Sequence, residues 1–79
     1  MINRKDVLIK RAASTGNLNP YSVDFEKSDI EYFGNTEYLV IRDNADILSV
    51  FLIYEWQVEA LEPEDWPDYL LDEAAEVEA

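Results

Sequence analysis

Residues 37–54, EYLVIRDNADILSVFLIY, decide the fold of this chain. Two segments rich in β-branched and aromatic residues, 38–41 and 47–54, flank the turn-forming residues 43–46. Runs of this composition on either side of a turn rich in Asp and Asn predict an antiparallel hairpin. The stretch therefore supplies at least two strands of an antiparallel sheet.

The second of these segments, 47–54, is apolar on both of its faces. A strand of that kind is expected at the centre of a sheet, covered on both sides or placed in a dimer interface, with Val50, Leu52 and Ile53 buried. The candidate covers are an N-terminal helix and an amphipathic C-terminal segment. We therefore expect an α+β fold in a single domain over residues 1–79, with both helices packed on a short antiparallel sheet.

A helix is predicted over residues 4–15. Asn3 followed by Asp6 resembles a capping box, with Asp in place of the usual Glu or Gln, and Gly16 is placed as a helix C′ residue. A strand over residues 7–10 is the competing interpretation, because short apolar runs are ambiguous by periodicity alone.

The segment between this helix and the hairpin has weaker patterns. Residues 21–25 alternate between apolar and polar side chains, which predicts a short half-buried strand. Ser28, followed by acidic residues, is typical of an N-cap, and Gly34 comes shortly afterwards. A single helical turn ending at Gly34 is expected there.

The C-terminal stretch 55–79, called the acidic run below, holds ten Asp and Glu residues and neither Lys nor Arg. Pro63 suits a first helical turn, whereas Pro67 would break a helix interior. The main helix is therefore expected to begin at Trp66 or Pro67, with Asp65 as N-cap.

Helical spacing then places four acids on one side of this helix: Asp65, Asp68, Asp72 and Glu76. Four other residues fall on the opposite side: Trp66, Leu70, Ala74 and Val77. Residues 76–79 are candidates for fraying.

The net charge and its distribution limit the kinds of molecule that this protein is expected to bind. The net charge is −12 over 79 residues, and it is distributed as +3 over residues 1–23, −5 over 24–54 and −10 over 55–79. Such a field disfavours nucleic acid and anionic membrane as direct partners and favours a basic protein surface. The basic cluster of Arg4, Lys5, Lys10 and Arg11 is expected to pair with the acidic run inside the molecule.

Composition argues against catalysis and metal binding. Cys and His are both absent, so disulfides, thiolate metal sites and the commonest catalytic base are excluded. Residues 43–46 lack the Gly and the terminal Glu of a calcium loop. We expect no enzyme activity, no metal and no cofactor. No signal peptide or membrane-spanning segment is expected, which favours the cytoplasm.

Small size, acidity, a compact α+β pattern and carboxylates in ladder spacing resemble the phage and mobile-element inhibitors that mimic DNA. These include anti-CRISPR proteins, anti-restriction proteins and the inhibitor of uracil-DNA glycosylase. The resemblance is to a class, without a shared motif. It implies an inhibitor that occupies the positively charged channel of a nucleic-acid-binding protein or ribonucleoprotein complex, in the host cytoplasm if the gene belongs to a phage.

The residues predicted to bind that partner are Glu59, Glu62, Glu64, Asp65, Asp68, Asp72 and Glu76, together with Trp66 if its ring is exposed. A second acidic row is predicted at Asp24, Glu26, Asp29 and Glu31. Three alternatives stay open: a solvated face that only keeps the protein soluble, an immunity protein or antitoxin for a basic nuclease, and an oligomerisation module that uses the hairpin edge. The sequence allows a monomer or a homodimer.

Overall fold

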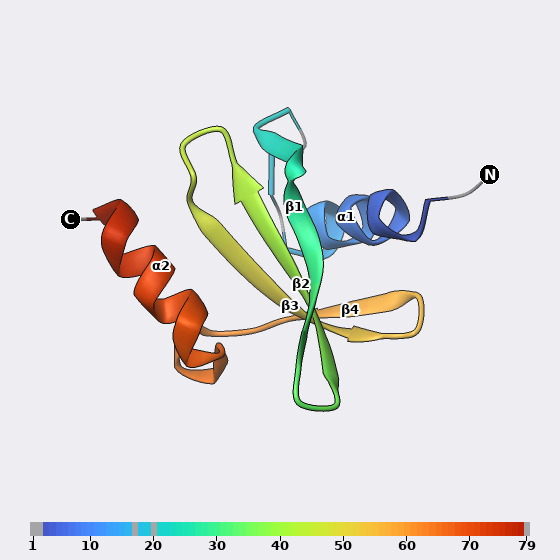
Figure 1. Ribbon diagram of the computed structural model, residues 1–79. Coiled ribbons are helices and arrows are strands. Elements are labelled where there is room, and N and C mark those ends of the chain that lie inside the picture. The colour runs from blue at the N-terminus through green and yellow to red at the C-terminus, as the bar shows by residue number, and fades with distance from the viewer. Residues whose placement is uncertain (1–2, 17, 20, 79) are drawn as a thin grey trace.

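The computed structural model describes residues 3–16, 18–19 and 21–78, with the side chains of residues 77 and 78 left aside. Two α-helices flank an antiparallel sheet of four strands, one helix on each side (Figure 1). The elements follow one another as α1 (Arg4–Thr15), β1 (Val23–Phe33), β2 (Thr36–Asp43), β3 (Leu48–Tyr54), β4 (Gln57–Ala60), a 3-10 turn η1 (Pro63–Asp65) and α2 (Asp68–Glu78). The predicted α+β architecture is confirmed.

The sheet is a meander with the strand order β1-β2-β3-β4, so each strand pairs with its neighbours in the sequence. The predicted hairpin is confirmed as β2 and β3, in which Val40 pairs with Val50. The turn between them is closed by Asp43, whose carboxylate accepts hydrogen bonds from the N–H groups of Ala45 and Ile47. This side-chain bonding is the reason that Asp favours turns.

β1 corrects the prediction for residues 21–34. It is one strand of 11 residues and contains no helical turn. The strand register shifts between Asp24 and Asp29, which marks a β-bulge. Ser28 is fully buried there, and its Oγ accepts from the N–H of Arg42 and donates to the carbonyl of Asp24. Gly34, at φ +65°, begins the two-residue turn into β2.

α1 has the predicted bounds and covers one side of the sheet, the α1 face. The side chain of Asn3 caps it by accepting from the N–H groups of Lys5 and Asp6. Gly16 ends the helix with φ −89°, so the left-handed C′ conformation is not adopted. A Cβ at this position would lie 2.8 Å from Cζ of Phe51, so Gly16 permits close packing. The core of the α1 face consists of Leu8, Ile9, Ala12, Leu39, Ile41, Phe51 and Ile53.

α2 covers the other side of the sheet, the α2 face, through Leu70, which is fully buried against Val40, Leu48 and Val50. β3 is thus covered on both faces, and the predicted burial of Val50 and Ile53 is confirmed. The prediction for Leu52 is wrong. This residue is only half-buried, because it lies on the part of the α2 face that the helix does not reach.

The start of α2 also differs from the prediction. The helix begins at Asp68, and Asp65 belongs to η1 instead of serving as its N-cap. Pro67 is buried, and its carbonyl accepts from the N–H groups of Leu70 and Leu71. Proline is suited to this place because it needs no partner for a missing N–H. The helix continues to Glu78, while Ala79 and the side chain of Val77 lie outside the described residues.

Candidate acidic interface

All seven acids predicted to bind a partner are exposed, and they come from one continuous part of the chain. Glu59 lies on β4, Glu62 precedes η1, and Glu64 and Asp65 lie within η1. The remaining three, Asp68, Asp72 and Glu76, lie on α2. Among the described side chains, Glu73 is the only member of the acidic run that forms an ion pair. No ion pair among the described residues therefore neutralises the charge of the seven exposed acids.

The predicted ladder of four acids is shortened to three. Asp68, Asp72 and Glu76 are spaced four apart on one exposed side of α2, so successive carboxylates are separated by about 6 Å along the helix axis. Asp65 is separated from them by the break at Trp66 and Pro67. It joins Glu62 and Glu64 in a second acidic group at η1, where the chain crosses from β4 to α2.

Trp66 does not meet the condition under which it was predicted to bind a partner. Its ring is half-buried and packs against the core of the α2 face. The indole Nε1 donates a hydrogen bond of 3.2 Å to the carbonyl of Leu61. The side chain thus holds the crossing segment against the sheet.

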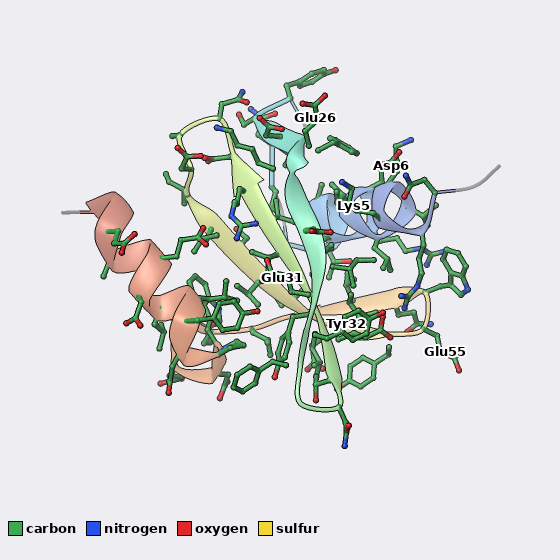
Figure 2. The ribbon with its side chains drawn as sticks, viewed as in Figure 1. Lys5, Asp6, Glu26, Glu31, Tyr32 and Glu55 are labelled. Atoms are coloured by element: carbon green, nitrogen blue, oxygen red, sulfur yellow. The ribbon has the colours of Figure 1, made fainter. Side chains whose placement is uncertain are left out.

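The four acids of the predicted second row lie on β1, where two make hydrogen bonds within the protein and two are exposed. Asp24 supports the bulge by accepting from the N–H groups of Glu26 and Lys27, and Glu31 bonds to Arg42 and Tyr69. The other two members, Glu26 and Asp29, are exposed. Figure 2 places Glu26 near one end of the strand and Glu31 near the middle of the sheet. These four acids do not form one free row.

Arg42 is the centre of a polar network that the sequence analysis missed. Its Nε lies 2.8 Å from Oε2 of Glu73, and its Nη2 lies 2.9 Å from Oε1 of the same residue. Nη1 donates to the carbonyl of Lys27, and Nη2 also reaches Glu31 at 3.4 Å. The hydrogen bond from Arg42 holds the pKa of Glu73 below its usual value, against the opposing effect of burial. A guanidinium and two carboxylates thereby connect β1, β2 and α2.

The basic cluster of α1 does not pair with the acidic run as expected. Arg4 forms its ion pair with Glu37 of β2 at 2.6 Å and donates a second hydrogen bond to the backbone carbonyl of Glu55. No ion pair within the described part of the chain involves Lys5, Lys10 or Arg11. The positive end of the molecule lies on α1, on the opposite side of the sheet from α2 (Figures 1 and 2).

A second feature that the sequence analysis missed lies on the α2 face beside the helix, which reaches it only through Tyr69. Glu31, Tyr38, Leu52 and Glu59 pair in register across all four strands. Phe33 and Tyr54 follow two residues later on their strands and so project from the same face. Phe33 is 53% exposed and Tyr54 is 54% exposed. We call the surface formed by Phe33, Tyr38, Leu52, Tyr54 and Tyr69 the open end.

Tyr69 connects the open end to α2. Its ring lies 5.9 Å from that of Phe33, measured between centroids, and its hydroxyl donates a hydrogen bond of 2.9 Å to Glu31. Burial, reinforced by this carboxylate, raises the pKa of Tyr69 to about 12. Burial and the nearby carboxylate of Glu59 also raise the pKa of Tyr54. Negative charge thus lies at both margins of an exposed aromatic surface.

Among the described residues, no group of three Asp or Glu side chains is arranged to hold a metal ion. The helices described here are too short or too polar to cross a bilayer. No family model matches the chain, and neither a curated protein nor a solved structure was found to match it. The exposed side chains are therefore the features that bear on function.

Proposed function

We propose that this protein is an acidic inhibitor that binds the positively charged nucleic-acid-binding surface of a partner protein by mimicking DNA. The observation that supports the proposal is the set of seven exposed acids between Glu59 and Glu76, none of which is neutralised by a described ion pair. Uncompensated charge of one sign attracts the opposite charge and accelerates association.

The scaffold under these acids favours recognition over simple solubility. α2 is fixed to the sheet by buried Leu70 and by the ion pair between Arg42 and Glu73, so its exposed carboxylates keep their relative positions. Their spacing of about 6 Å is comparable in scale with the separation of phosphates, which recur about every 3.4 Å of axis along one DNA strand. Carboxylates held in this way can replace phosphates in front of Lys and Arg side chains.

Among basic partners, we propose RNA-guided DNA-binding complexes, which hold their target in a positively charged channel. The inhibitor would occupy the channel and exclude DNA without any chemical step. Its action would then require neither a metal ion nor a nucleophile.

The test is a competition experiment with a panel of purified RNA-guided DNA-binding complexes and labelled target DNA. We expect the protein to displace DNA from at least one complex, with an affinity that falls steeply between about 0.05 and 0.5 M salt because screening shortens the reach of the charges. The variant Asp72→Asn with Glu76→Gln should bind about fivefold more weakly, since exposed ion pairs contribute little singly.

The matched control neutralises two acids elsewhere, through Asp6→Asn with Glu55→Gln. Both residues lie on the α1 side of the molecule, away from α2 (Figure 2). This control has the same net charge as the α2 variant, so a difference between the two isolates the position of the charge. Salt-insensitive binding, equal effects of the two variants, or simultaneous binding of DNA would contradict the proposal.

A further inference from the structure

The open end is an aromatic surface that α2 covers only at one margin, where the ring of Tyr69 lies against Phe33. Leu70 of α2 covers Val40, Leu48 and Val50, whereas Phe33 and Tyr54 remain more than half exposed. Exposed apolar surface rimmed by polar residues is characteristic of interaction sites. Aromatic residues are also the ones most enriched where binding energy is concentrated.

Charge decides what kind of partner this patch accepts. Glu31 and Glu59 lie at opposite ends of one row across the sheet, about 15 Å apart at the usual strand spacing. Arg42, which contacts this row at Glu31, is already held by Glu73 and Glu31. A second copy of this chain would bring another net charge of −12 to the surface, and repulsion disfavours that occupant.

The chemistry of the surface distinguishes arginine from lysine. A guanidinium is planar, is weakly hydrated and stacks on aromatic rings while it bonds a carboxylate through its edge. Glu59 is exposed and lies diagonally across from Tyr54 on the neighbouring strand, because Leu52 pairs with Glu59 and Tyr54 with Gln57. The same face already holds one guanidinium, that of Arg42, between the carboxylates of Glu31 and Glu73.

We infer that the open end is a docking site for arginine side chains of a basic protein partner, with Tyr54 and Phe33 as stacking surfaces and Glu59 as the carboxylate. This inference rests on the proposed function, because the acidic group at η1 and α2 would bring the partner to the surface. It goes beyond that function by assigning a second contact with the partner, at which arginine is preferred over lysine although both carry the same charge.

The experiment uses two peptides of equal charge, hexa-arginine and hexalysine, titrated calorimetrically into the full chain at about 0.05 M salt. We expect hexa-arginine to bind about fivefold more tightly, because only the guanidinium gains from stacking. Resonances of the Phe33 and Tyr54 rings should shift in NMR spectra with hexa-arginine. This second measurement locates the site without any substitution.

The variants Phe33→Ala and Tyr54→Ala should each reduce the preference for hexa-arginine, and together they should bring the two affinities to within about twofold. The matched control is Tyr32→Ala. Tyr32 is 69% exposed and adjoins Phe33 in the sequence, but it projects from the other face of β1, away from Glu31 (Figure 2). This control should keep the preference.

Equal affinities in the unaltered protein, or a preference that survives loss of both rings, would overturn the inference. If both peptides then still bind and both weaken in the Asp72→Asn and Glu76→Gln variant, the charge-based inhibitor remains supported while the arginine site is refuted. If neither peptide binds, the proposed function falls together with the site.

Discussion

Arg42 of β2 and Glu73 of α2, 31 positions apart in the chain, form an ion pair with two hydrogen bonds of 2.8 and 2.9 Å. The Arg42 side chain is 19% exposed and that of Glu73 is 34% exposed. Paired geometry of this kind is the strongest form of a charge-assisted hydrogen bond. The contact fastens a helix covered in negative charge to the sheet.

We expect Glu73→Gln to lower the free energy of unfolding by about 1 kcal/mol, a value discounted for the solvent exposure of the pair. Urea denaturation measures this change. Glu76→Gln is the matched control, because it removes the same charge from an exposed position of the same helix. It should leave the stability unchanged or slightly raised by relieving repulsion. A loss of equal size in both variants would show that the pair is not what holds α2.

The same pair predicts a pH dependence. Because Arg42 lowers the pKa of Glu73 in the folded protein, the pair stabilises the fold above the ordinary value of 4.5 and loses its contribution as pH falls through the lowered pKa. The difference in stability between the unaltered protein and Glu73→Gln should therefore be constant near neutrality and shrink below about pH 4.5. Urea midpoints measured for both proteins from about pH 7 to pH 3 provide the test. A difference that grows on acidification would contradict this assignment.

Burial on the α2 face predicts a contrast between two neighbouring leucines. Leu70 is fully buried, whereas Leu71 is 36% exposed. Leu70→Ala should cost about 2 to 5 kcal/mol of stability through lost burial and a residual cavity, and Leu71→Ala should cost much less. Leu52→Ala should fall between them, since Leu52 is half-buried. Thermal or urea unfolding of the three variants checks the order, and equal losses would refute the packing of α2.

The turn between β3 and β4 contains a strained backbone conformation that glycine adopts without strain. Glu55 has φ +56°, in the left-handed region that is costly for residues with a Cβ. Glu55→Gly should raise the stability by about 0.5 to 1 kcal/mol. The bond from Arg4 is retained, because the backbone carbonyl accepts it. Glu55→Gln removes the charge but keeps the Cβ, so an equal gain in that control would assign the effect to charge.

Local patterns were sufficient for the parts of the fold that depend on neighbouring residues. The hairpin of β2 and β3 follows from its apolar runs and its turn, and α1 begins where Asn3 caps it. The helical turn predicted after Ser28 is absent because the Ser28 hydroxyl does not cap a helix. It donates to the carbonyl of Asp24 in the bulge and accepts from the N–H of Arg42 on β2. A side chain that bonds to a remote strand leaves no local periodicity.

The candidate interface was predictable only in part for the same reason. Consecutive acids without nearby Lys or Arg predicted exposed charge, and Glu59, Asp68 and Asp72 are exposed. The pairing of Glu73 with Arg42 depends on the orientation of α2 on the sheet. Local sequence patterns do not predict that orientation. The open end could not be predicted either, because it exists only where the helix stops covering the strands.

The bulge in β1 has a consequence for behaviour at high concentration. β1 is the longest strand and forms one edge of the sheet, which would ordinarily offer a template for pairing with other chains. Asp24 interrupts this template by engaging the N–H groups of Glu26 and Lys27 with its own carboxylate. The opposite edge, β4, has only four residues. With one edge interrupted and the other this short, the sheet offers little template for strand-to-strand pairing, and we expect the protein to resist that form of aggregation even at high concentration.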